Sequence, residues 1–159
     1  MNSISFGNPN DVTSSTNPAR WARISGAVQQ TYNNLSSVPV TFQTVTQSNP
    51  ALGNLASNAF TFNGTYRLLV STHFQLGSNA TAGPGYVTVY GRKNGVTIAD
   101  SVMEMLWTYV DEMEFLSTSF VIDVVAGDTY DVLSSSNSST RFGLGLSGAQ
   151  CKCVQFTQI

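Results

Sequence analysis

The chain has 159 residues and a mass of 17.1 kDa, and 42% of its residues are hydrophobic, which suits one domain with a sizeable core. Seven Lys and Arg residues stand against nine Asp and Glu residues, and no basic run could neutralise a phosphate backbone, so we expect no nucleic-acid partner. Ser, Thr, Asn and Gln together number 58, so neutral polar groups must supply most of the solubility.

The N-terminal residues show no targeting pattern. The opening MNSISFGNPNDV lacks a basic segment followed by an apolar one, and no later stretch approaches the roughly 18 apolar residues of a membrane span. We therefore expect a protein that is made without secretion and does not insert into a membrane.

Residues 1–37 are rich in Asn, Ser, Thr and Pro and are interpreted as an N-terminal arm. After the Asn17-Pro18 pair, a helix-like spacing of three and four residues connects Trp21, Ile24, Val28 and Thr31 or Tyr32. This spacing predicts a short amphipathic helix. The arm is either a flexible segment with one anchored aromatic residue or a segment for attachment and trimer contact.

From Val38 onward the hydrophobic period changes to two. In TYRLLVSTHFQL, one face of a half-buried strand is formed by Tyr66, Leu68, Val70, Thr72, Phe74 and Leu76. The single histidine, His73, falls on the opposite and more polar face. We interpret it as a structural residue rather than a catalytic one.

An Asn-Gly pair gives the clearest turn in the sequence. Asn94-Gly95 separates two β-rich runs and predicts a tight type I′ hairpin, because both central residues must tolerate positive φ. Counting the other runs gives roughly nine or ten short strands between Val38 and Ile159, with no long helix. The expected fold is all-β, an antiparallel two-sheet sandwich.

A second corner lies in FVIDVVAGDTYDVL, where acids at Asp123, Asp128 and Asp131 surround Gly127. Gly supplies permissive backbone angles, and an Asp side chain can bond to nearby backbone amides. We therefore predict a structural turn here in preference to a catalytic or metal site.

The order of these motifs resembles the jelly-roll domain shared by tumour necrosis factor and the globular head of complement's first component. The resemblance covers residues 38–159 and is carried by VTFQTVTQS, FTFNGTYRLLVSTHFQL, VYGRKNGVTIADS, FVIDVVAGDTYDVL and FGLGLSGAQCKCVQFTQI. It implies a two-sheet jelly roll that assembles as a homotrimer through aromatic and aliphatic side chains.

Similar jelly rolls occur in fibres, spikes and decorations of bacteriophages and other viruses. The hypothesis is therefore a non-enzymatic virion protein, made in the host cytoplasm, whose arm at residues 1–37 binds virion or capsid proteins. Its head would recognise a host-surface glycan or protein, or reinforce the particle. The alternatives are a carbohydrate-binding lectin-like module and a bacterial spore or surface-layer protein of the same fold.

Catalytic patterns are missing from the sequence. Chemistry of the Ser–His–acid type would require His73, and no nucleophile elbow or phosphate-cradling Gly loop is present, so we predict neither an enzyme nor a cofactor. Cys151 and Cys153 are two residues apart on an expected strand, a poor geometry for a mutual bridge, and are interpreted as free thiols.

The exposed loops at about residues 77–85, 107–117 and 134–141 are the expected recognition surface, because loops on a rigid sheet can vary without loss of the fold. Trp107 and Tyr109 are the preferred receptor or glycan contacts, although their alternation with Met103 and Met105 equally fits core or trimer interface. The acidic residues Asp111, Glu112 and Glu114 could add contacts. They could also hold calcium, but a solvated loop is the simpler interpretation.

Overall fold

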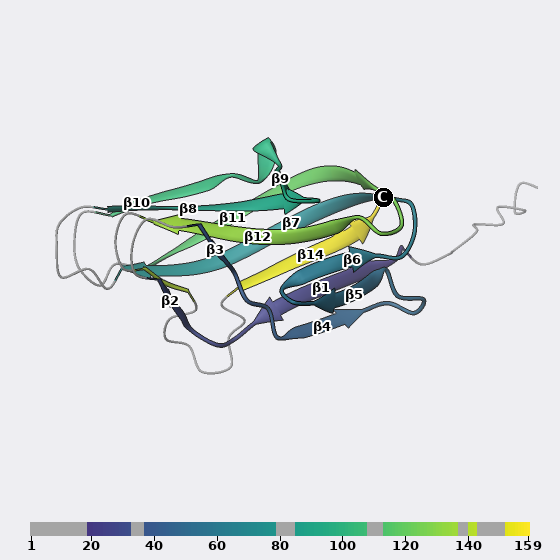
Figure 1. Ribbon diagram of the computed structural model, residues 1–159, viewed down its shortest axis with the longest axis horizontal. Coiled ribbons are helices and arrows are strands. Elements are labelled where there is room, and N and C mark those ends of the chain that lie inside the picture. Colours follow the sequence, from purple (N-terminus) through teal and green to yellow (C-terminus); the bar gives the residue numbers. More distant parts are fainter. Residues whose placement is uncertain (1–18, 33–36, 79–84, 108–112, 137–139, 143–151) are drawn as a thin grey trace, which may run out of the picture.

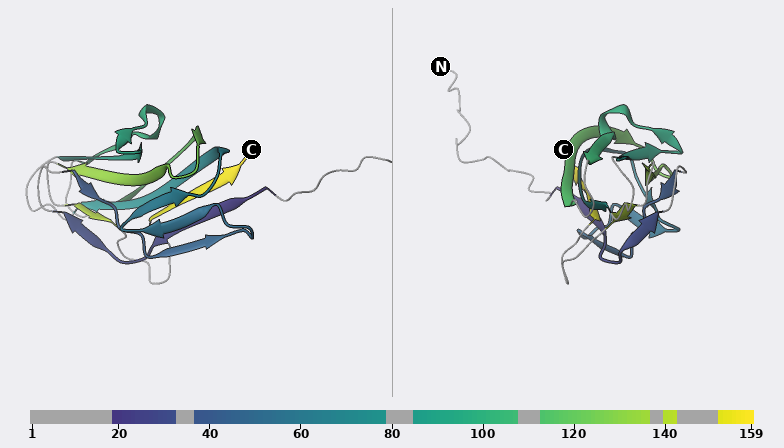
Figure 2. Two further views of the ribbon diagram at one scale, coloured as in Figure 1. Left: turned by 45° about the vertical axis from the view of Figure 1, so that its right-hand side comes forward. Right: turned by 90° about the vertical axis from the view of Figure 1, so that its left-hand side faces the viewer.

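The computed structural model describes residues 19–32, 37–78, 85–107, 113–136, 140–142 and 152–159 (Figure 1). Fourteen strands and a single 3-10 turn at Ala99–Ser101 make up the regular structure of these residues. The strands form two antiparallel sheets, and the end-on view of Figure 2 shows the two layers enclosing a common interior. No helix within these ranges is long and apolar enough to cross a membrane.

The first sheet, here called sheet I, is organised around one long strand. Its strands are β7 (Tyr66–Ser78), β11 (Met113–Val124), β14 (Lys152–Gln158), β13 (Thr140–Phe142), β1 (Trp21–Gly26), β4 (Thr44–Gln47) and β2 (Gln30–Tyr32). Strand β7 pairs along its length with β11 on one side, and with β14 and β13 on the other. Strand β1 then lies between β14 and β4.

The second sheet, sheet II, covers the other side of the interior. It contains β8 (Gly85–Lys93), β10 (Met103–Trp107), β12 (Thr129–Ser136), β6 (Ala59–Phe62), β5 (Gly53–Ala56), β3 (Val38–Pro39) and β9 (Val96–Thr97). Its main order is β10-β8-β12-β6-β5, with β3 paired to β12 and β9 to β8. The expected all-β, two-sheet antiparallel sandwich is therefore confirmed.

The alternation predicted for β7 is confirmed in detail. All six residues assigned to its inner face are buried, and five of them, all but Thr72, belong to the hydrophobic core shared with sheet II. Phe156 of β14 stacks on Phe60 at 5.0 Å between ring centroids and makes edge contacts with Phe62 and Tyr130, each at 5.2 Å. These rings connect the two layers and remove a large apolar area from water.

Both predicted corners are confirmed as turns. Asn94 and Gly95 have φ of 51° and 79°, as a type I′ hairpin requires, and Lys93 pairs with Val96 across the turn. Gly127 has φ of 91°, which favours glycine. The second corner is not a hairpin, however, because it carries the chain from β11 in sheet I to β12 in sheet II.

The short helix predicted near the N-terminus is wrong. Residues from Trp21 to Gly26 form β1, in which Ala22 and Ile24 are fully buried and alternate with outward-facing Trp21 and Arg23. Four apolar residues at helical spacing were too few to outweigh pairing with two neighbouring strands. Residues 21–32, assigned by sequence to the arm, thus contribute two strands to sheet I, and residues 1–18 lie outside the described residues.

Candidate functional site

The outer face of sheet I is a regular grid of side chains, because antiparallel registers align the outward residues of five strands. One row across the sheet consists of Thr46, Arg23, Gln155, Ser71 and Ser119. The next row consists of Trp21, Thr157, Leu69 and Val121. The β7–β11 half of this face and the β4–β1–β14 half differ in chemistry.

The β7–β11 half is apolar with small hydroxyl groups, and we call it the contact strip, defined by Leu69, Val121 and Phe115. These side chains are 37%, 45% and 58% exposed. Its only charged pair among the described residues is at one end, where Arg67 and Asp123 are 3.9 Å apart and well exposed, an arrangement that contributes little stability. Along β7 and β11 the rows of Ser71–Ser119 and His73–Ser117 separate the Leu69–Val121 pair from Phe115. The strip therefore alternates apolar and polar groups, and its exposed apolar side chains suit contact with a partner.

His73 lies within the contact strip, and its ring stacks on Phe115 at 5.4 Å between centroids. Its Nδ1 is 2.8 Å from the Ser117 hydroxyl oxygen. A Ser–His pair is part of a hydrolase site, but a working site also needs a group that orients the base and donors for an oxyanion. Across the strand pair His73 faces Cys153, and no carboxylate among the described residues bonds to it. The pair fits a packed sheet surface better than a reaction centre.

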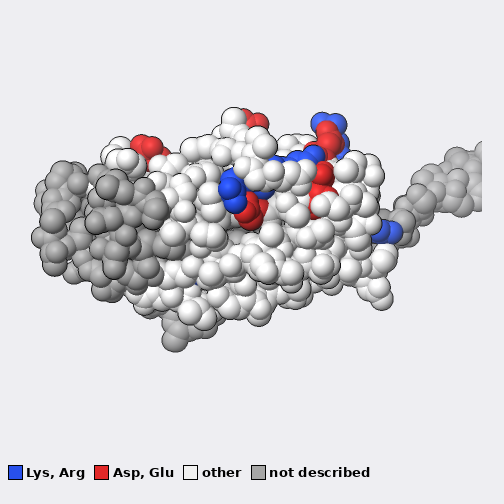
Figure 3. All heavy atoms as spheres, viewed as in Figure 1, with Lys and Arg blue, Asp and Glu red and all other residues white. Residues whose placement is uncertain are grey.

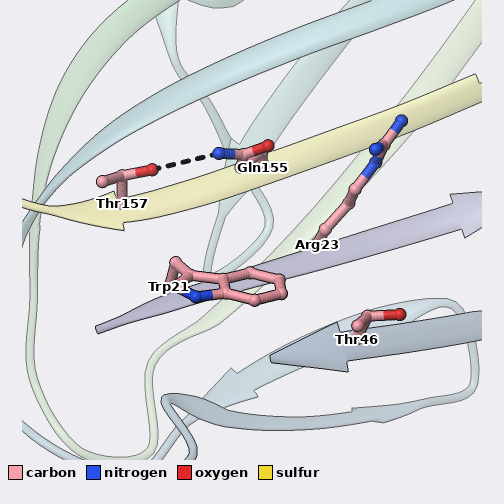
Figure 4. Close-up of a pocket in the computed structure, with 5 residues that line it drawn as sticks. All are labelled: Trp21, Arg23, Thr46, Gln155 and Thr157. Atoms are coloured by element: carbon pink, nitrogen blue, oxygen red, sulfur yellow. Dashed lines mark hydrogen bonds between the residues drawn. The ribbon is translucent and has the colours of Figure 1, made fainter. Parts of the chain in front are cut away.

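The β4–β1–β14 half contains a hollow of about 480 Å³. Figure 4 shows its five lining side chains, which come from three adjacent strands: Thr46, Trp21, Arg23, Gln155 and Thr157. Within this set Gln155 Nε2 donates a long hydrogen bond of 3.4 Å to Thr157 Oγ1. The lining thus combines one aromatic ring, one cation and three neutral hydrogen-bonding groups.

Arg23 is the charged group of this hollow. Its Nη2 donates to the Cys153 sulfur at 3.6 Å, and its buried Nε has no hydrogen-bond partner among the described residues. A thiol is a weak acceptor, so this guanidinium keeps most of its capacity for a carboxylate. In contrast, the guanidinium of Arg92 in sheet II is matched by Asp131, which raises the pKa of Arg92.

The Gly127-Asp128 corner is satisfied internally. The Asp128 carboxylate accepts hydrogen bonds from Asn94 Nδ2 at 2.7 Å, from the Val125 backbone N–H at 2.9 Å, and from Lys93 Nζ at 2.9 Å. These donors, Asn94 above all, lower the pKa of Asp128 to about 2. The carboxylate holds the crossover between the sheets, and donors of the protein itself occupy three of its roughly four acceptor positions.

The predicted contact residues are only partly described by the structure. Tyr109, Asp111 and Glu112 lie outside the described residues, and for Trp107 the structure gives only its backbone position at the end of β10. Glu114 is exposed on β11, opposite Leu76 of β7. Their role in receptor or glycan contact stays a prediction. Among the described residues, no three His, Cys, Asp or Glu side chains gather where they could hold a metal ion.

Sequence reasoning missed the residues of the hollow and one buried cation. Lys152 is fully buried at the start of β14, where its Nζ donates to Gln30 Oε1 at 2.5 Å and to Thr41 Oγ1 at 3.3 Å. The alternation of Lys152 with Val154 and Phe156 in the sequence could have predicted its burial, because these three residues fall on the same face of a strand. The free thiol expected at Cys153 is confirmed, and Cys151 lies outside the described residues.

Comparison with known proteins identifies the fold. No family model and no curated protein matches the sequence. The solved structure of Eiger TNF from S. frugiperda superimposes with a TM-score of 0.58 at 9% identity, covering 89% of this chain and 93% of that one. Murine APRIL at pH 5.0 superimposes with a TM-score of 0.57 at 13% identity, covering 89% and 99%. The chain therefore has the jelly-roll fold of TNF-family domains.

Proposed function

We propose that this protein is a non-enzymatic, homotrimeric recognition head, and that it serves as a virion spike, fibre tip or decoration. The observation that carries the proposal is the contact strip of Leu69, Val121 and Phe115, an exposed apolar surface on a fold whose resemblance implies threefold assembly. Burial of such a surface against another copy would remove it from water and stabilise the assembly.

The edge formed by β10 and β11 offers a complementary surface. These strands end their respective sheets, and the exposed apolar side chains near this edge include Leu106 and Val102. A strip on one subunit that receives the edge of the next is a heterologous contact, which closes into a ring when the rotation is 120°. A trimer would also protect the exposed edge strands from open-ended pairing.

The charged side chains leave a large part of the surface uncharged, which favours a partner that is bound through neutral groups. On the face that Figure 3 shows, Lys, Arg, Asp and Glu lie in the upper half of the view, some of them near its middle, and the lower half of the described surface is uncharged. Such a surface binds through hydrogen bonds and aromatic contacts rather than through long-range attraction. The role in a virion is supported by the Ser/Thr/Asn-rich composition and by the use of similar jelly rolls in the fibres and spikes of viruses.

The mass of the protein in solution tests the trimer. We expect a species of about 51 kDa, three times 17.1 kDa, at micromolar concentration. The double variant Leu69→Glu/Val121→Glu should give a folded monomer, because two buried carboxylates per contact are costly to desolvate. Val96→Glu is the matched control, since Val96 is 70% exposed in the β8–β9 hairpin away from the strip.

Two results would contradict the proposed assembly. One is a monodisperse monomer for the unmodified chain. The other is equal disruption by Val96→Glu, which would show that any added charge, and not the strip, decides the mass. Circular dichroism of each variant establishes that the sheets are still formed.

A carbohydrate-binding module is the second candidate function, and the hollow on β4, β1 and β14 specifically favours it. Trp21 provides an aromatic platform, and Thr46, Gln155 and Thr157 provide neutral hydrogen-bonding groups. A glycan array with the purified chain separates the two: binding to sugars supports the module, whereas binding only to particles supports decoration. A virion head that binds sugar would combine both.

A further inference from the structure

We propose that the hollow on β4, β1 and β14 is a binding site for a carboxylated sugar, a sialic acid or a uronic acid, with Arg23 as the carboxylate-binding residue. This inference rests on the recognition role proposed above and names the class of ligand. It makes the β4–β1–β14 half of sheet I a ligand site and leaves the β7–β11 half for contact between subunits.

The ion pairs of the described residues favour a negatively charged ligand for Arg23. Arg92, Lys93 and Arg67 each have an Asp within 4.0 Å, whereas Arg20 and Arg23 have none among the described residues. Arg20 donates to the Tyr66 hydroxyl and Lys152 to the Gln30 amide oxygen, so Arg23 is the cation with the weakest acceptor. Within the described ranges, the one side-chain hydrogen bond of Arg23 goes to the Cys153 thiol, and no Asp or Glu lines the hollow. A carboxylate would replace a weak sulfur acceptor by two oxygen acceptors in the planar geometry that a guanidinium prefers.

Trp21 and its neighbours favour a sugar as the ligand of the hollow. Trp21 is partly exposed, and its position two residues before Arg23 on a strand puts both side chains on one face, with their Cα atoms about 7 Å apart. An indole ring packs well against the C–H face of a pyranose, with its N–H left for a polar partner. Figure 4 shows the Arg23 guanidinium directed away from the indole, so the ligand would place its ring on Trp21 and extend its carboxylate along the hollow to Arg23.

The hydroxyl groups of a sugar would meet the neutral side chains. Gln155 is exposed, and its bond to Thr157 is long enough, at 3.4 Å, to be exchanged for a ligand hydroxyl at little cost. Thr46 lies directly across from Arg23 in the register of β1 and β4 and completes the rim. The hollow's volume of about 480 Å³ falls in the usual range of small-ligand sites, roughly 300–1,000 Å³.

The test measures binding to the full chain with two matched pairs of probes. The first pair is 3′-sialyllactose and lactose, and the second is methyl glucuronide and methyl glucoside, so each pair differs by the acidic component. We expect the acidic member of at least one pair to bind about tenfold or more tightly than its neutral partner. Tryptophan fluorescence should also change on binding in a Trp107→Phe background, in which Trp21 is the one tryptophan left. The pair that discriminates identifies the source of the carboxylate.

Variants assign the effect to the hollow. Arg23→Gln should lose about tenfold or more in affinity for the acidic probe and leave the neutral probe unaffected. Arg67→Gln is the matched control, because Arg67 is an exposed cation on the same face outside the hollow and should not change either affinity. Trp21→Phe keeps an aromatic ring and the β1 pairing, and should weaken binding of both members of the pair.

Measuring the mass of the protein on the same samples tests the trimer independently of the sugar-binding site. A monomer that prefers the acidic probe contradicts the trimer and supports the hollow. A trimer that binds neither acidic probe, or binds acidic and neutral probes equally, overturns the assignment of the hollow. Loss of the trimer in Arg23→Gln without a change in sugar affinity also overturns it, because the hollow would then be filled by a second copy of the chain.

Discussion

The aromatic contact between the two sheets can be tested by truncating Phe156 to Ala. This ring is fully buried on β14 of sheet I, and it touches three rings of sheet II, Phe60, Phe62 and Tyr130, at centroid distances of 5.0–5.2 Å. Removing it takes away the side chain that fills the centre of the interior, and the surrounding strands are fixed by their own hydrogen bonds and can close the gap only partly.

The expected loss follows from the burial and the ring contacts. Truncation of a buried Phe typically lowers the free energy of unfolding by about 3–5 kcal/mol, and a site with no exposure and three ring partners belongs in the upper part of that range. For a chain of this length this corresponds to a Tm lower by roughly 10 °C. Phe156→Leu retains most of the volume but loses the ring pairs, each of about 0.5–1.5 kcal/mol, so its loss should be about half as large.

Thermal unfolding followed by circular dichroism at two protein concentrations measures these effects. Phe115→Ala is the matched control, because Phe115 is 58% exposed in the contact strip. Its own fold contribution should be small, and any loss through subunit contact should depend on concentration, whereas the loss from Phe156→Ala should not. Equal, concentration-independent losses for both variants would refute the idea that the sheets close over Phe156.

Three further predictions concern the turns and one buried hydroxyl. The pKa of Asp128 is lowered to about 2, so its stabilisation of the fold is present above the ordinary pKa near 4 and is lost as the pH falls toward 2. The Tm difference between the unmodified chain and Asp128→Asn should therefore shrink over that pH range. A Tm difference that stays constant would contradict this prediction. Gly127→Ala should cost about 1–2 kcal/mol in denaturant unfolding because φ is 91°, and no loss would mean that the turn rearranges. The Tyr130 hydroxyl is buried without a hydrogen-bond partner among the described residues, so Tyr130→Phe should raise the free energy of unfolding by about 1 kcal/mol. Gly91→Ala should lower the free energy of unfolding by about 1–3 kcal/mol, because the added Cβ would overlap that hydroxyl. Urea midpoints that move in the opposite directions would show that this hydroxyl has a partner and that Gly91 has room.

The alternation of residues 66–76 was sufficient to predict β7, because one face of a strand must be apolar when it covers a core. The Asn94-Gly95 hairpin was predictable for a local reason as well, since it depends on two adjacent residues that accept positive φ. The order of the remaining motifs indicated the jelly roll. The strand and the hairpin are each encoded within about ten consecutive residues, whereas the jelly roll is indicated by motifs spread over residues 38–159.

The features that sequence could not supply depend on distant pairing. Residues 21–26 carry a spacing that suits either a short helix or a strand, and only the neighbouring strands β14 and β4 decide between them. The hollow has the same origin. It joins Trp21 and Arg23 to Gln155 and Thr157, more than 130 positions away, and no local pattern indicates that these residues meet.

The register of β1 links the stability of the sandwich to the chemistry of its outer face. Ala22 and Ile24 are fully buried, so a shift of β1 by one residue would expose both of them and turn Trp21 and Arg23 toward the core. That shift would bury a guanidinium without a carboxylate, which costs several kcal/mol. The burial of Ala22 and Ile24 that fixes β1 between β14 and β4 therefore also places Trp21 and Arg23 on the outer face. Because both side chains are carried by a strand, no loop has to be ordered to hold them there.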